Sequence, residues 1–180
     1  MMETRLDLRP GQVAIVIGVD HKIQHVVPHI GPNHPRNNLR LRFQEFLEQI
    51  TGRYRLDVIC EEAKHGVVSI SQAFADLKGI PYRNIEMSPD VRRIHGIPEL
   101  SALHVPGSET PRKQKRAWNA LQESYMIEKL LRYVAGASSV MAICGVSHMP
   151  ALIQATRPKF GRVEKYDVTA MPWFDPSVLP

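Results

Sequence analysis

Short apolar runs alternate with amphipathic segments along this chain, and that alternation limits its fold more than any other feature. The first run, Val13 to Ile17, is apolar at every position and ends at Gly18. Such a run is typical of a strand that is covered on both faces, as in a parallel sheet. The same reasoning predicts further strands over 56–60, 82–87, 139–144 and 162–168.

Helices are predicted between these strands. Asn37 or Asn38 can cap a helix that runs through Thr51 with a continuous apolar face, and Gly52 follows it as a stop signal. Further helices are predicted over 69–78, from Pro111 to about 135, and from Pro150 to 157, whereas 88–110 is expected to be irregular.

This order of elements predicts the fold class. Strands joined by helices through short connections favour right-handed crossovers and a mainly parallel sheet. The 180 residues, 43% of them hydrophobic, suit one globular domain. We therefore expect a single α/β domain over 1–180, a three-layer Rossmann-like fold with five strands and the first strand near the centre.

Several protein classes are disfavoured by the sequence. The longest apolar stretch, Val13 to Val19, is too short to span a bilayer, and the N-terminus lacks the apolar region of a secretory signal. The two cysteines, Cys60 and Cys144, end apolar runs and are expected to be reduced and buried. We expect a cytoplasmic protein with no membrane partner.

Ligands of parallel α/β sheets bind at the carboxyl ends of the strands, so the residues at these ends are the candidates for a functional site. Two Gly-x-x-His motifs follow strands, at Gly18–His21 and Gly145–His148, and Glu61 ends another. Glu62 would face the opposite side of its strand, and Glu61 is the residue that we expect in the site. His21, Glu61 and His148 are therefore predicted to converge.

Imidazole and carboxylate groups together suit either a divalent metal ion or direct acid–base catalysis. The competing interpretation treats each histidine as an ordinary loop residue, and His65 as a residue that caps a turn. Glu123 is a further candidate, because the long predicted helix should overhang the carboxyl edge of the sheet. Its alternative role is a surface ion pair with Arg116, Lys129 or Arg132.

The charge balance favours acidic partners. Lys and Arg exceed Asp and Glu by 23 to 18, a net charge of +5. Basic residues in the segments predicted to reach the carboxyl edge suggest an anionic substrate, although such clusters are also common on solvated surfaces; they are Arg92, Arg93, Arg112, Lys113, Lys115 and Arg116. Glycine-rich phosphate-binding motifs are missing from the sequence, so no nucleotide cofactor is expected.

The motifs resemble a known superfamily. Gly18–His21, the acidic strand end Asp57-Val58-Ile59-Cys60-Glu61-Glu62 and Gly145–His148 are similar to the superfamily of TraB and Tiki proteins, erythromycin esterases and ChaN. The resemblance runs from about Val13 to about Gln154. It implies a parallel α/β core and a hydrolytic site of two histidines and acidic residues, with metal in Tiki-type members but not required in esterase-type members.

A set of small uncharacterised bacterial proteins is more similar still. They share a Gly-x-Asp-His-x-x-Gln start, matched by His21 and Gln24, an Arg-rich Gly-Ile-Pro segment, matched by Arg92–Pro98, and a Glu-x-Tyr-Met helix, matched by Glu123–Met126. The chain lacks the additional helical segments that would form a substrate cap in larger relatives, so the resemblance does not carry a substrate with it.

Two functions are compatible with these observations. In the first, the protein is a small hydrolase in which His21, Glu61 and His148 hold a divalent ion such as zinc or manganese, or act directly as acid–base groups with Glu123 beside them. In the second, the same edge of the sheet is a non-catalytic binding or regulatory module for an anionic ligand or nucleic acid.

Overall fold

The computed structural model describes residues 12–25, 35–98 and 112–179, and the side chains of Arg36 and Arg112 are outside this description. Five strands form one sheet in the order β3-β2-β4-β1-β5, and every neighbouring pair is parallel. The strands are β1 Val13–Val19, β2 Val58–Glu61, β3 Tyr82–Asn84, β4 Ser139–Gly145 and β5 Arg162–Asp167. The predicted fold class is confirmed.

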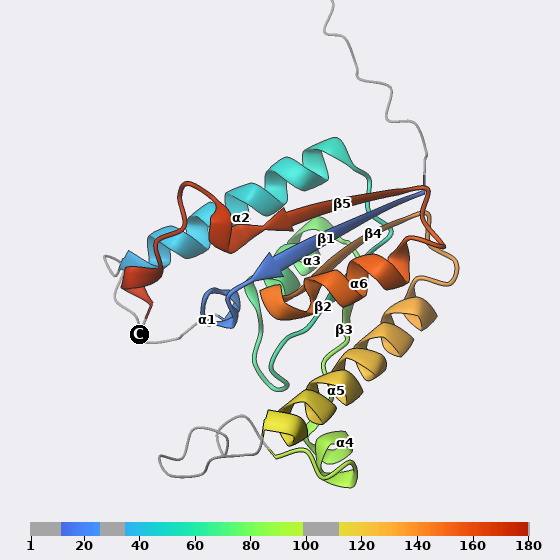
Figure 1. The fold of residues 1–180 in the computed structure, drawn as a ribbon. Helices are drawn as coiled ribbons and strands as arrows, with labels where there is room; N and C mark the ends of the chain where they lie inside the picture. The colour runs from blue at the N-terminus through green and yellow to red at the C-terminus, as the bar shows by residue number, and fades with distance from the viewer. Residues whose placement is uncertain (1–11, 26–34, 99–111, 180) are drawn as a thin grey trace, which may run out of the picture.

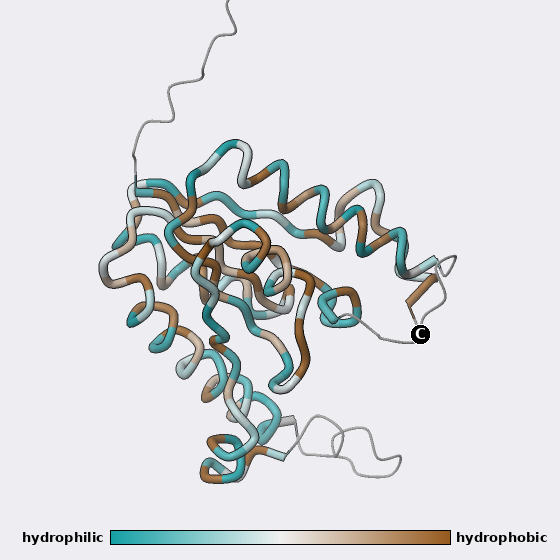
Figure 2. Tube along the Cα trace, turned by 180° about the vertical axis from the view of Figure 1, so that it is seen from behind, coloured by the Kyte–Doolittle hydropathy of each residue, from teal (hydrophilic) through white to brown (hydrophobic). Residues whose placement is uncertain are grey.

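Helices cover both faces of the sheet (Figure 1). On one face α2 (Pro35–Arg53) and α3 (Ile70–Lys78) pack through apolar side chains such as Phe43 and Phe74. On the other face α5 (Arg112–Tyr133) and α6 (Met149–Thr156) bury residues such as Met126 and Leu152. Figure 2 shows that hydrophobic residues are concentrated in the strands, whereas hydrophilic and hydrophobic residues alternate along the helices. This is the expected three-layer arrangement.

The central strand is β4, and β1 lies next to it between β4 and β5. All seven residues of both strands are buried, which explains why they read as continuous apolar runs. The edge strands β3 and β5 contain polar residues, as exposed sheet edges usually do.

The start of β2 is fastened to the start of β4. The Asp57 carboxylate accepts hydrogen bonds from the main-chain N–H groups of Ser138 (2.7 Å) and Ser139 (3.0 Å). These two bonds, the first of them most strongly, lower the pKa of Asp57. The contact sets the register of the short β2 against the central strand.

Two regions differ from the sequence-based expectation. β3 ends at Asn84 and not at Met87, because the Asn84 side chain accepts a hydrogen bond from the Glu86 N–H (2.8 Å) and turns the chain. The segment predicted to be irregular contains α4 (Pro89–Ile94), which Ser88 caps through the Val91 N–H. The predicted helix start at Pro111 lies outside the described residues.

Two short helices continue the carboxyl ends of β1 and β4. They are α1 (His21–Gln24), which Asp20 caps, and a 3₁₀ turn over Val146–His148 that leads into α6. Both predicted Gly-x-x-His motifs thus begin inside a strand and end in a helical turn. No helix in the described part of the chain is both long and apolar enough to cross a membrane.

Candidate functional site

A cavity of about 600 Å³ opens at the carboxyl edge of the sheet. Its wall includes His21 after β1, Glu62 after β2 and His148 after β4, and it also includes Gln122 from α5 and Arg92 from α4. The carboxyl edge is where ligands of parallel α/β sheets bind. This position and the residue types make the cavity the candidate site.

Glu62 lies at the base of this site and is only 2% exposed. Its Oε2 accepts a hydrogen bond from the Gly145 N–H (2.8 Å), and its Oε1 accepts one from Gln122 Nε2 (3.0 Å). Burial raises the pKa of Glu62 to about 7; His148 opposes this shift and Glu86 adds to it. A carboxylate with such a pKa can hold or release a proton near neutral pH.

Two histidines face this carboxylate. His21 Nε2 lies 3.7 Å and His148 Nε2 3.6 Å from Glu62 Oε1. Each histidine has a second partner at Nδ1, which is Gln24 Oε1 for His21 (2.5 Å) and Glu123 Oε1 for His148 (3.0 Å). The structure therefore brings both predicted histidines to one carboxylate, with Nε2 of each ring directed at it.

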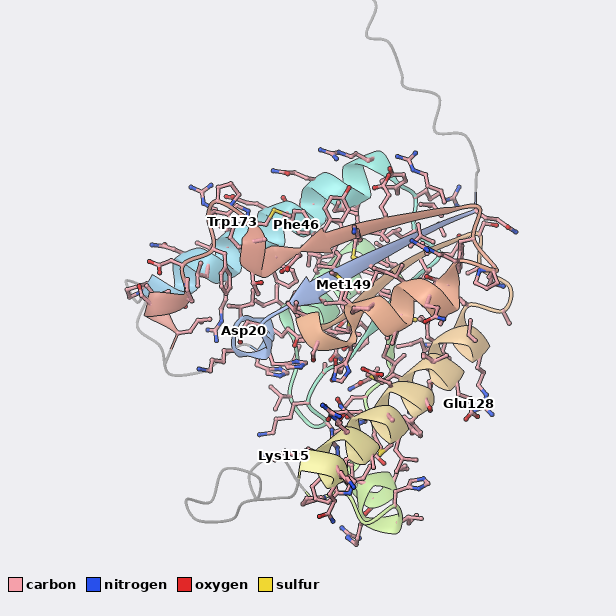
Figure 3. The ribbon with its side chains drawn as sticks, in the orientation of Figure 1. Asp20, Phe46, Lys115, Glu128, Met149 and Trp173 are labelled. Atoms are coloured by element: carbon pink, nitrogen blue, oxygen red, sulfur yellow. The ribbon has the colours of Figure 1, made fainter. Side chains whose placement is uncertain are left out.

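The glycines of the two motifs have a packing role. A Cβ on Gly145 would lie 2.6 Å from His21 Nε2, and a Cβ on Gly18 would lie 3.0 Å from Met149 Sδ. Neither glycine is among the described positive-φ residues. Both glycines allow close approach of other groups: Gly145 leaves room for the His21 ring, and Gly18 leaves room for the start of α6, where Figure 3 labels Met149.

The assignment of Glu61 to the site needs correction. Adjacent residues of a strand face opposite sides of the sheet, and here Glu62 faces the cavity while Glu61 faces α3. Glu61 is fully buried and accepts hydrogen bonds from the Ser69 hydroxyl, from the Tyr82 hydroxyl (2.8 Å) and from Gln24 Nε2 (3.0 Å). Burial raises the pKa of Glu61, and these three donors oppose the shift.

Glu123 contacts the site, as the overhang of the long helix suggested. It lies ten residues before the end of α5, about 15 Å along the axis, which brings it level with the carboxyl end of β4. Its Oε1 meets His148 Nδ1, and this contact replaces the surface ion pairs considered as the alternative.

A polar wall beside Glu62 consists of three residues, Gln122, Glu86 and Arg92. Gln122 Nε2 donates to Glu62 and also lies 3.2 Å from Glu86 Oε2. Glu86 in turn forms a buried ion pair with Arg92 (2.7 Å). Arg92 was expected on a basic rim, and its guanidinium instead neutralises Glu86 inside the wall.

The other basic side chains of this prediction that the structure describes do not line the cavity, and the Arg112 side chain lies outside the description. Arg93 pairs with Asp90 (3.1 Å), and Lys113, Lys115 and Arg116 are exposed on the first turns of α5, where Figure 3 labels Lys115. The lysines that line the cavity are Lys22 and Lys64. The positive charge expected at the mouth thus comes from α1 and from the loop after β2.

Two further histidines line the cavity. His65 Nε2 lies 3.1 Å from the main-chain oxygen of Glu86, so this side chain lines the cavity and contacts the segment that follows β3. His25 is half-buried, and burial followed by the charges of His21, Lys64 and Arg40 lowers its pKa. The next two histidines along the chain, His29 and His34, lie outside the described residues.

The predicted metal ligands do not assemble. Glu61 is separated from His21 and His148 because it faces the other side of the sheet. Among the described residues, no group of three or more His, Cys, Asp or Glu side chains is arranged to hold a metal ion. Two imidazoles converge on one carboxylate that has its own hydrogen-bond donors, and this arrangement suits proton transfer.

Comparison with known proteins adds no relatives: no family model, no curated protein and no solved structure matches this chain. The resemblance to the TraB, Tiki and erythromycin esterase superfamily stays a prediction.

Proposed function

We propose that this protein is a small hydrolase that cleaves an ester or related acyl bond by acid–base catalysis. The observation that carries the proposal is the convergence of His21 Nε2 and His148 Nε2 on the buried Glu62 carboxylate, at the base of a cavity. Two proton carriers around one carboxylate are what the attack of water on a carbonyl needs. We expect it to act in the cytoplasm.

His21 is the proposed general base. Its side chain is 47% exposed, so a water molecule in the cavity can reach Nε2, whereas His148 is largely buried at 9%. As water attacks the acyl carbon, its proton passes to His21 Nε2, and the nearby Glu62 stabilises the imidazolium that forms.

His148 is the proposed general acid. Its ring lies between the carboxylates of Glu62 and Glu123, and the Glu123 contact at Nδ1 directs Nε2 toward the cavity side. His148 gives a proton to the leaving oxygen as the acyl bond breaks. His148 therefore starts as the imidazolium and ends neutral, whereas His21 starts neutral and ends protonated. The proton returns from His21 to His148 through Glu62 Oε1, which lies 3.7 Å from His21 Nε2 and 3.6 Å from His148 Nε2, so both starting states are restored and one water molecule is consumed.

We propose that the substrate has an apolar body and an anionic group. Met87 and Pro89 contribute apolar surface to the cavity wall, and Lys22 and Lys64 contribute positive charge. An anionic group held there would place the acyl bond over the histidines. This replaces the basic residues of α5 as the basis for an anionic substrate.

The test is hydrolysis of a panel of 4-nitrophenyl esters with neutral and anionic acyl chains. Wild-type protein should hydrolyse at least one member, and His148→Asn and Glu62→Gln should each lower kcat by about 100-fold or more. Glu128→Gln, an exposed carboxyl on the same helix as Glu123, is the matched control and should be fully active. Equal rates for wild type and both site variants would contradict the proposal.

Metal content decides the remaining chemical alternative. Elemental analysis of protein purified without chelator should show less than one equivalent of zinc or manganese if the acid–base scheme operates. Stoichiometric metal that is lost in His21→Asn would instead support the metal-assisted hydrolase suggested by Tiki-type proteins.

The second candidate function is a binding module for an anionic ligand or nucleic acid, and the observation that favours it is the pair of lysines at the cavity wall. This second function would be supported by salt-sensitive binding of a single-stranded oligonucleotide or of inorganic phosphate, together with no hydrolysis of the ester panel.

A further inference from the structure

Gln24 is a fully buried side chain that joins His21 to the other face of the sheet. Its Oε1 lies 2.5 Å from His21 Nδ1, and its Nε2 donates to Glu61 Oε1 (3.0 Å) and to the main-chain oxygen of Glu62 (3.1 Å). All polar atoms of this amide are therefore engaged.

The neighbours of Gln24 allow only one orientation of its amide. The main-chain oxygen of Glu62 has no hydrogen to donate, so it must face the NH₂ group of Gln24. If the amide were turned over, its oxygen would face this carbonyl and the Glu61 carboxylate, and two hydrogen bonds would be lost inside the protein. The Gln24 oxygen consequently faces His21.

Glu61 keeps this amide in place. It accepts hydrogen bonds from the Ser69 and Tyr82 hydroxyl groups as well as from Gln24. Ser69 is itself fixed, because its Oγ also caps α3 by accepting from the Gln72 N–H (2.9 Å). A chain of oriented hydrogen bonds thus runs from the N-terminus of α3 through Glu61 and Gln24 to the His21 ring.

We propose that Gln24 is a positioning residue that holds His21 in one tautomer, with the proton on Nδ1 and the lone pair on Nε2. An amide oxygen can only accept, so the ring nitrogen that faces it must carry a hydrogen. The lone pair then lies on the nitrogen that faces Glu62 and the cavity. The use of this lone pair as a base rests on the proposed function, but the tautomer does not.

The inference gives Glu61 a role on the side of the sheet away from the cavity. Glu61 touches neither histidine, and it acts through the orientation of the Gln24 amide. His148 has the same arrangement through a different residue, because the acceptor at its Nδ1 is the Glu123 carboxylate. Both histidines thereby present Nε2 lone pairs to the site when neutral.

The test measures the tautomer directly. Long-range ¹H–¹⁵N spectra of labelled protein, at a pH above the ordinary imidazole pKa of about 6.5, report which ring nitrogen carries the proton. The His21 signals are identified by their loss in His21→Asn. Wild type should show His21 protonated on Nδ1 alone, and a proton on Nε2 would overturn the proposal.

Variants of Gln24 separate positioning from packing. Gln24→Leu removes the acceptor, so the Nε2-protonated form of His21 should appear, and the kcat of ester hydrolysis should fall by at least about tenfold with little change in KM. Gln24→Glu keeps an acceptor for Nδ1 and should retain the tautomer, although it places a carboxyl group against Glu61 and lowers stability. Gln49→Leu, at an exposed position of α2, is the control and should change neither quantity.

The His21 tautomer can be measured whether or not the protein hydrolyses esters, so the two proposals can fail separately. If no ester is hydrolysed but the tautomer changes only in Gln24→Leu, the positioning role stands and the hydrolase proposal fails. If Gln24→Leu is folded and its His21 tautomer equals that of wild type, the positioning role is refuted whatever the activity.

Discussion

Gly145 lies so close to His21 that a Cβ on Gly145 would be 2.6 Å from His21 Nε2. The same glycine donates its main-chain N–H to Glu62 Oε2 (2.8 Å). One residue at the end of β4 therefore holds the carboxylate of the site and leaves the space in which the imidazole lies beside it. Gly145 belongs to the same Gly-x-x-His motif as His148, but the side chain for which it leaves space is that of His21.

Gly145→Ala should displace the His21 ring from Glu62. Because that ring is half exposed, it can move outward, and we expect stability to fall by only about 1 kcal/mol while ester hydrolysis falls by at least about tenfold. Steady-state kinetics and urea unfolding measure the two effects. Gly52→Ala in α2, where an added Cβ meets nothing within 4 Å, is the control and should be active and slightly more stable. Full activity of Gly145→Ala would contradict the contact.

Glu62→Gln should change the pH dependence of stability. The pKa of Glu62 is about 7 in the folded protein against an ordinary value of 4.5, so between these values the folded state binds the proton more tightly than the unfolded state. The carboxylate therefore destabilises the fold progressively as pH rises from about 4.5 to 7. The glutamine variant should be more stable than wild type by roughly 3 kcal/mol above pH 7, since one pKa unit corresponds to about 1.4 kcal/mol.

Urea unfolding at several pH values from acid to slightly alkaline measures this difference. It should be smallest near the ordinary carboxyl pKa and reach a plateau above about pH 7. Parallel stability curves for the two proteins would show that Glu62 titrates normally.

Glu123→Gln should impair His148 without unfolding the protein. The amide can still contact Nδ1 but carries no charge to stabilise an imidazolium, so we expect kcat to fall by about 10- to 100-fold with an unchanged unfolding midpoint. Glu128→Gln removes an exposed carboxyl from the same helix, at the position labelled in Figure 3, and should leave kcat unchanged. Equal kcat values for the two variants would remove Glu123 from the site.

Lys64→Gln should weaken capture of anionic esters more than of neutral ones. Exposed charges act within a Debye length of about 8 Å at physiological ionic strength, so the loss in kcat/KM should shrink as salt is added. Lys115→Gln is the control, because Lys115 is exposed on α5 and does not line the cavity. If both variants lower kcat/KM for anionic esters equally, the effect comes from net charge, and the inference of an anionic subsite is wrong.

The backbone architecture was predictable because the signals for it are local. Apolar runs such as Val13 to Ile17 identify strands that are covered on both faces, and helices between them enforce parallel pairing. The helix α4 was missed, although Ser88 as a cap, Pro89 in the first turn and Gly96 beyond the end are its usual signals. The helix was not predicted because the segment between these signals is short and polar and has no extended apolar face.

The carboxylate of the site was harder to predict. Strand alternation shows that Glu61 and Glu62 face opposite sides, but it does not say which side holds the cavity, because that depends on where α1 and α5 pack. Gln24 and Gln122 were missed for a related reason. An amide side chain has no characteristic spacing, and its role appears only once its partners, from other strands and helices, are in place.

The pleat of β2 sends two adjacent carboxyl groups into different surroundings, one into an open cavity and one into a dry cluster of hydroxyl and amide groups. The register of β2 against β4 determines which group faces the cavity, and at the far end of the strand the Asp57 carboxylate fastens this register. A shift of one residue in this register would turn Glu61 toward the cavity and Glu62 away from it. Which glutamate faces the cavity in this protein thus depends on strand register, and the contact that fastens this register lies at the opposite edge of the sheet.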